Sequence, residues 1–187
     1  MKTFVCFGDS LTYGYGVPVG KVWHQRLKEN MDIRIINRGS NGDSLLGMQI
    51  RLARDVLESG GDVCLFMAGS NDLMMGKSSE EVYLGIRKIK EKINEKDIDT
   101  ILISPPPSIP EMAEISWDSY PDCNQFNKSL EDLSNRLKKD FPNNFINVFE
   151  KFMSLSYPER KKLFLDGIHL NEEGNEFLGR IIQSGIL

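Results

Sequence analysis

The sequence predicts an α/β fold, with a parallel sheet that is covered by helices on both faces. Short apolar runs alternate along the chain with longer segments in which apolar residues recur at helical spacing. The apolar runs are nearly continuous, which is typical of strands buried on both sides. The length of 187 residues, with 40% hydrophobic and 27% charged residues, is typical of a soluble globular domain. We therefore expect one domain over residues 1–187.

The first half of the chain contains three predicted strands and two predicted helices. The strands are expected at residues 3–7, 32–37 and 62–67. A glycine stops each apolar run, at Gly8, Gly39 and Gly69. Helical spacing predicts helices over residues 22–30 and 44–58.

The second half continues the alternation. Helices are expected at residues 79–96, at residues 123–139 and from residue 171 toward residue 186. Strands are expected at residues 100–104 and 145–148. Three consecutive prolines, at positions 105–107, end the fourth strand because proline cannot donate to a ladder.

Residues 104–122 form the one long stretch without a helical or strand pattern. This stretch is rich in proline and contains Trp117 and Tyr120. It follows the carboxyl end of a strand, where open α/β sheets bind their ligands. A loop of this length is usually functional, although an ordered surface loop fits the pattern as well. Whether it closes as a lid is not determined by the sequence.

Small polar clusters follow the first three strands and contain Ser10, Gly42 and Asn71. Because the carboxyl ends of parallel strands meet at one edge of the sheet, these residues should converge despite their separation in sequence. A fourth polar cluster, which contains Asp166 and His169, precedes the last helix.

The residue types in these clusters are those of nucleophilic catalysis. A serine hydroxyl needs a base that is neutral near pH 7, and histidine is the side chain that ordinarily fills this role. Of the two histidines, His169 has a carboxylate three residues before it, at Asp166, which can hold its tautomer. His24 lies inside a helical segment, and we expect it to be a surface or half-buried histidine.

The same clusters contain donors for an oxyanion. Ser10 and Gly42 offer backbone N–H groups, and Asn71 offers a side-chain amide. Each cluster alone could be only a turn or a helix cap. Their joint position at the strand ends, together with the Asp166–His169 pair, favours a catalytic site.

Taken together, these motifs resemble those of the SGNH hydrolase superfamily, the GDSL-type lipases, esterases and acylhydrolases. The matching segments are residues 7–12 followed by Gly14, residues 37–42, residues 69–72 and residues 166–169. The resemblance implies a flavodoxin-like three-layer α/β/α sandwich with a five-stranded parallel sheet. It also implies ester hydrolysis through an acyl-enzyme, without a metal or a cofactor.

The resemblance also implies roles for individual residues. Ser10 would be the nucleophile, His169 the general base and Asp166 its orienting partner. The oxyanion hole would consist of Ser10, Gly42 and Asn71, whereas Asp9 and Asp72 would support the loops.

Other classes of protein fit the sequence less well. Gly14, Gly16 and Gly20 lack the spacing of a dinucleotide fingerprint, and no Gly-x-Ser-x-Gly of an ordinary α/β-hydrolase occurs. Two distant histidines and three scattered cysteines do not form a zinc site. A non-catalytic flavodoxin-like binding module is the remote alternative, and a decayed module would be expected to lose one of the catalytic residues.

The substrate is less well defined than the reaction. Several apolar residues are expected near the site, namely Tyr13, Tyr15, Met74, Met75, Ile109, Met112 and Trp117. We assign Tyr13, Met74, Met75 and Trp117 to the substrate pocket. They favour a small carboxylic ester, a thioester or a lysophospholipid with an apolar acyl group. Aromatic residues such as Trp117 and Tyr120 also stack on sugars, so a carbohydrate O-acetylesterase is the alternative.

Charge and cysteine content bear on partners and location. The net charge of −4 argues against nucleic acid and anionic membranes as partners, and no apolar stretch approaches the length of a membrane span. Cys6 and Cys64 lie in apolar runs and are expected to be buried thiols, as in a reducing compartment. A strand that begins at residue 3 leaves no room for a signal peptide. We therefore expect a cytoplasmic protein, whose oligomeric state the sequence does not indicate.

Overall fold

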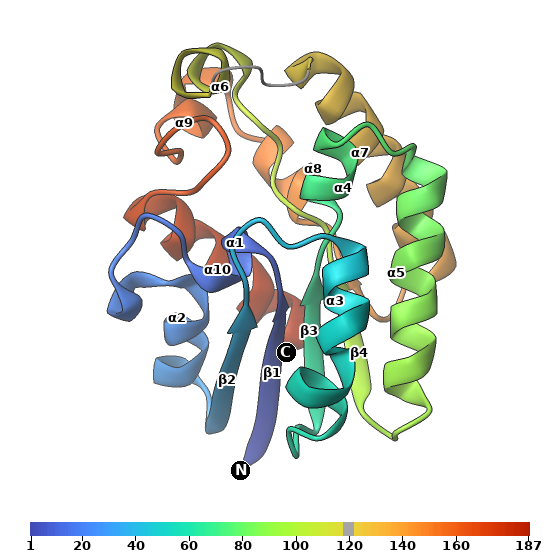
Figure 1. The fold of residues 1–187 in the computed structure, drawn as a ribbon. Coiled ribbons are helices and arrows are strands. Elements are labelled where there is room, and N and C mark those ends of the chain that lie inside the picture. Colours follow the sequence, from blue (N-terminus) through green and yellow to red (C-terminus); the bar gives the residue numbers. More distant parts are fainter. Residues whose placement is uncertain (118–121) are drawn as a thin grey trace.

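The centre of the molecule is a sheet of five strands, all parallel, in the order β2-β1-β3-β4-β5 (Figure 1). The computed structural model describes residues 1–117 and 122–187. The strands are β1 (Lys2–Gly8), β2 (Ile33–Gly39), β3 (Val63–Met67), β4 (Asp99–Ile103) and β5 (Phe145–Ile146). The predicted α/β class, with five parallel strands, is confirmed.

Helices cover both faces of this sheet. One face packs against α3 (Leu45–Leu52), the short π-helical segment η2 (Ala53–Leu57), α5 (Ser79–Asn94) and α7 (Cys123–Asp140). The other face packs against α2 (Trp23–Asn30) and α10 (Glu172–Ile186). The helix α8 (Val148–Met153) contributes side chains to the cores on both sides.

Short helical elements fill the space beyond the carboxyl ends of the strands. They are α1 (Ser10–Tyr13), η1 (Val19–Lys21), α4 (Ser70–Met74), α6 (Pro110–Ser116) and α9 (Tyr157–Lys161). Figure 1 shows α4 and α6 above the arrowheads of the strands, with α1 directly after β1. The loops that should carry chemistry therefore lie at one edge of the sheet, as expected for a parallel sheet.

The alternation of side chains along β1 produces the two cores. Val5 and Phe7 face the helices α3, α5 and α7, and the Phe7 ring lies 5.6 Å from that of Phe66. Phe4 and Cys6 face the opposite core, which contains α2 and α10. These four side chains are all buried. Because both faces of β1 are covered, its sequence is a continuous apolar run and does not alternate with polar residues.

Most predicted ends are shifted by one or two residues, and three segments differ for a clear physical reason. The helix expected over residues 44–58 is α3 followed by the π turn η2, since its last turn widens. The stretch 104–122 was expected to be irregular but contains α6, which begins at Pro110, a residue favoured in a first helical turn. The last strand ends at Ile146 rather than residue 148, because Asn147 caps α8. Tyr120 lies outside the described residues.

Within residues 1–117 and 122–187, no helix is both long and apolar enough to cross a membrane.

His24 is buried and not a surface residue, which corrects the expectation for this residue. It lies on α2 beside Trp23, and only 2% of its surface is exposed. Neither ring nitrogen has a hydrogen-bond partner among the described residues. Burial lowers the pKa of His24 from 6.5 to about 4, because the charged ring would be poorly solvated.

The buried His24 should make the protein less stable in mild acid. Between pH 6.5 and pH 4 the unfolded chain binds a proton at His24 and the folded chain does not, so stability decreases as the pH falls. From pH 7 to pH 4.5 this amounts to about 2 kcal/mol. Urea unfolding of wild type and His24→Leu at both pH values should show that the variant lacks this part of the loss. Equal pH dependence in both proteins would contradict the assignment.

Candidate active site

Ser10 lies at the end of the strand β1, at the start of α1. The strand ends at Gly8, and Asp9 caps α1 by accepting a hydrogen bond from the Leu11 N–H at 3.0 Å. Ser10 is therefore the first helical residue. This turn holds the serine at the carboxyl edge of the sheet, where the loops after β2 and β3 also begin.

A continuous chain of polar contacts joins Ser10, His169 and Asp166. The Ser10 Oγ and His169 Nε2 atoms lie 3.0 Å apart, and His169 Nδ1 lies 2.7 Å from Asp166 Oδ2. His169 and Asp166 belong to the loop before α10, and Ser10 is 159 residues away from His169 in the sequence. The three predicted residues thus come together with the geometry of a nucleophile, a base and an orienting carboxylate.

The second carboxylate oxygen of Asp166 fixes the loop. Asp166 Oδ1 accepts hydrogen bonds from the backbone N–H groups of Ile168 at 2.9 Å and of His169 at 2.7 Å. Burial alone would raise the pKa of Asp166, but the bond from the His169 ring and these two N–H groups outweigh it and lower the pKa. The carboxylate therefore stays ionised beside the imidazole.

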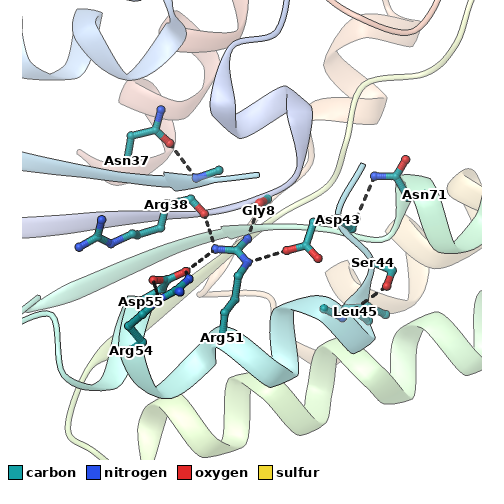
Figure 2. A network of polar contacts seen from close by, with 12 residues as sticks. Gly8, Asn37, Arg38, Asp43, Ser44, Leu45, Arg51, Arg54, Asp55 and Asn71 are labelled. Atoms are coloured by element: carbon teal, nitrogen blue, oxygen red, sulfur yellow. Dashed lines mark hydrogen bonds and ion pairs between the residues drawn. The ribbon is translucent and has the colours of Figure 1, made fainter. Parts of the chain in front are cut away.

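Gly42 and Asn71 bring further hydrogen-bond donors to the same place. Gly42 has a φ of +69°, which favours glycine, and a Cβ atom there would meet open space. The Asn71 amide donates to the Asp43 backbone carbonyl at 2.9 Å, as Figure 2 shows. This bond uses one of the two amide protons and leaves the second for another acceptor.

Asp9 and Asp72 hold the neighbouring loops. Asp9 caps α1, as described above, and its side chain is almost fully buried. Burial raises the pKa of Asp9 to about 6. Asp72 accepts a hydrogen bond from the Leu45 N–H at 2.9 Å and pairs with Lys77 at 2.6 Å. The carboxylate of Asp72 thus ties α4 to the start of α3.

A cavity of about 380 Å³ lies over these groups. Its lining consists of Ser10, Leu11, Tyr15, Asn41, Gly42, Ser70, Asn71, Met74, Trp117, Ile168 and His169. Two aromatic rings flank the His169 imidazole, with ring centroids at 4.3 Å for Tyr15 and 5.7 Å for Trp117. The site is therefore an apolar cavity with a few convergent polar groups, the usual form of a small-molecule site.

The structure places Met74 and Trp117 in the cavity wall, but not Tyr13 or Met75. Tyr13 is 51% exposed and Met75 is 63% exposed. Met75 directly follows Met74. Because successive residues at a helix end point in different directions, only one of the two can face the cavity, and this is Met74. The Tyr13 backbone packs against the end of β2, where the Asn37 amide donates to its carbonyl.

Sequence reasoning did not assign several cavity residues to the pocket. Tyr15 was expected near the site and lines the cavity, whereas Ile109 and Met112 do not. Asn41 and Ile168 also line it, and their adjacency to Gly42 and His169 was the available signal.

Comparison with known proteins identifies the family of the chain. Residues 6–177 match the family model of the GDSL-like lipase/acylhydrolase family, which is most of the chain. The chain belongs to this family. The family takes its name from lipases and acylhydrolases, which cleave acyl esters.

Individual relatives share a quarter or less of their sequence with this chain, at 25%, 22% and 20% identity. An arylesterase of Vibrio mimicus is 25% identical over 128 residues, which cover 64% of this chain and 64% of the arylesterase. Two solved structures show the same fold. A lipase/acylhydrolase from Enterococcus faecalis has a TM-score of 0.81 at 22% identity, covering 100% of this chain and 95% of that one. The acetyl xylan esterase AlAXEase has a TM-score of 0.80 at 20% identity, covering 99% and 100%.

Proposed function

We propose that this family member hydrolyses small carboxylic esters through an acyl-enzyme on Ser10. The observation that carries the proposal is the chain of contacts from Ser10 Oγ through the His169 ring to Asp166, at 3.0 and 2.7 Å. His169 Nε2 takes the hydroxyl proton while Ser10 Oγ forms a bond to the ester carbonyl carbon. Asp166 holds the proton on Nδ1, so that Nε2 is free to accept.

The carbonyl electron pair moves onto its oxygen in the tetrahedral intermediate. The Ser10 and Gly42 backbone N–H groups and the Asn71 amide stabilise this oxyanion. The intermediate then expels the alcohol, which receives its proton from His169. Water, deprotonated by the same imidazole, attacks the acyl-enzyme, and collapse of the second intermediate releases the acid and restores Ser10.

The cavity favours a neutral ester with an apolar group. Met74, Trp117 and Tyr15 form its apolar walls. None of the described residues that line it is a lysine or an arginine, so it offers no cation to the phosphate of a lysophospholipid or of a phosphorylated thioester carrier. Among the substrates that the sequence left open, we therefore propose a simple carboxylic ester.

A carbohydrate O-acetylesterase with the same mechanism is the second candidate. Trp117 is partly exposed at the cavity wall and lies beside His169, a position from which an indole ring can stack on a sugar. In that case the acetyl group would occupy only the part of the cavity next to Ser10.

A panel of esters tests the proposal and separates the two candidates. We expect hydrolysis of p-nitrophenyl acetate, butyrate and octanoate, with an initial burst of p-nitrophenol as the acyl-enzyme forms. A kcat/KM that rises from acetate to butyrate supports an acyl-binding cavity. Activity on acetylated xylo-oligosaccharides with none beyond acetate supports the alternative.

Covalent labelling provides the control for the panel. Diethyl p-nitrophenyl phosphate should add one diethylphosphoryl group to Ser10, with loss of p-nitrophenol, as seen in the peptide mass. No ester hydrolysis together with no label on Ser10 would contradict the proposed function.

Two further expectations stay predictions. A cytoplasmic location is supported by the three cysteines, which are all free thiols and buried. One hydrolase domain over residues 1–187 is supported by the family match across residues 6–177.

A further inference from the structure

One arginine side chain, that of Arg51, lies at the centre of a network of polar contacts (Figure 2). Arg51 is in the last turn of α3, and its side chain is only 12% exposed. Its guanidinium donates to the backbone carbonyls of Gly8 at 2.8 Å and Arg38 at 2.7 Å. It also donates to the carboxylates of Asp43 at 2.6 Å and Asp55 at 2.9 Å. One planar group thus joins four separate points of the chain.

Two of these points, Gly8 and Asp43, adjoin the segments that carry the proposed oxyanion donors. Gly8 is two residues before Ser10, at the end of β1. Asp43 directly follows Gly42, and its backbone carbonyl accepts the hydrogen bond from the Asn71 amide at 2.9 Å. The guanidinium therefore reaches the Ser10 and Gly42 segments directly, and the Asn71 amide through Asp43.

The start of α3 leaves room for this arrangement. A Cβ atom on Gly47 would lie 2.0 Å from Asp43 Oδ1, so glycine at this position lets the carboxylate lie against the helix. From there the other oxygen, Oδ2, accepts from Arg51 Nε. An alanine at position 47 would move the Asp43 carboxylate without altering any charge.

We infer that Arg51 is a positioning residue for the oxyanion hole, which it holds in place by fixing the ends of β1 and β2 and the Gly42–Asp43 segment. The inference rests on the proposed function, because the donors matter only if an oxyanion forms. The planar fork is required as well as the charge, since a lysine ammonium cannot bond to Gly8, Arg38 and Asp43 in one geometry.

Arg51→Gln and Arg51→Lys should both lower kcat for p-nitrophenyl ester hydrolysis by about 10- to 100-fold, the range found when a residue that orients a metal ligand is removed. KM should change little, because the misplaced donors act in the transition state. Gly47→Ala should also lower kcat with little change in KM. If Arg51→Gln fails to fold, the Gly47→Ala variant tests the inference in its place.

Arg54→Gln is the matched control. Arg54 lies three residues along the chain and pairs with the same Asp55 at 2.7 Å, but its side chain is 77% exposed and it donates to neither Gly8 nor Asp43. Its bond to Asp55 is the main cause that lowers the pKa of that carboxyl to about 2; burial opposes it, and Arg51 contributes less. Removing Arg54 therefore perturbs the charges of the network but not the loops, and kcat should be retained.

A readout without substrate separates this inference from the proposed function. The NMR signal of the Asn71 side-chain amide, assigned with Asn71→Asp, should move toward that of a solvent-exposed asparagine in Arg51→Gln and Gly47→Ala but not in Arg54→Gln. An unmoved Asn71 signal overturns the inference whatever the kcat values. If wild type cleaves no ester and Ser10 takes no label, the proposed function fails, and the Asn71 signal still decides whether Arg51 positions the amide.

Discussion

Replacing Ser10 with alanine should lower kcat for ester hydrolysis by about 10⁴- to 10⁶-fold, the range found when a serine nucleophile that works with a base is removed. The variant keeps the His169–Asp166 contact at 2.7 Å and the Asp9 cap of α1, so the loss comes from the missing hydroxyl and not from a rearranged site. The p-nitrophenol burst should disappear together with the steady-state rate.

Ser70→Ala is the control for this experiment. Ser70 is a second buried serine in the wall of the same cavity, but its hydroxyl has no hydrogen-bond partner among the described residues, hence no base to activate it. This variant should retain most of the activity and still take the phosphoryl label on Ser10. If Ser10→Ala kept wild-type kcat while Ser70→Ala lost it, the nucleophile would be assigned to the wrong strand end.

The convergence of the site could be predicted because it follows from topology. Once the apolar runs are read as parallel strands, the residues after β1, β2 and β3 must share one edge of the sheet. Ser10, Gly42 and Asn71 line one cavity for this reason. The pairing of Asp166 with His169 was predictable from their spacing, because a carboxylate three residues away can reach the ring within a turn.

Features that depend on side-chain direction or on distant backbone atoms could not be predicted in this way. Tyr13 was assigned to the pocket by its position in the chain, yet the short helix α1 turns it away. The contacts of Arg51 with Gly8 and Arg38 span 43 and 13 residues and end on carbonyl oxygens, which carry no residue-specific signal. The burial of His24 likewise depends on how α2 packs in the tertiary structure, which helical spacing alone does not determine.

Replacing Asp166 with asparagine should lower kcat by about 10⁴-fold, although the change only replaces one carboxylate oxygen with an uncharged NH₂ group of similar size. The two backbone N–H groups of Ile168 and His169 donate to one oxygen of residue 166, and an asparagine carbonyl would keep that place. The amide NH₂ then faces His169 Nδ1 and donates to it. The proton of the neutral ring moves to Nε2, which can no longer accept the proton of Ser10.

Asp166→Ala separates this tautomer effect from the support of the loop. Alanine removes the acceptor for both backbone N–H groups and should lower the melting temperature, whereas asparagine keeps the acceptor and should leave the melting temperature close to that of wild type. Both variants should have low kcat values in the p-nitrophenyl butyrate assay. An Asp166→Asn enzyme with nearly full kcat would show that Asp166 only caps its loop. In that case His169 would hold its reactive tautomer without a carboxylate, and the flanking rings of Tyr15 and Trp117 would be the remaining groups that orient it.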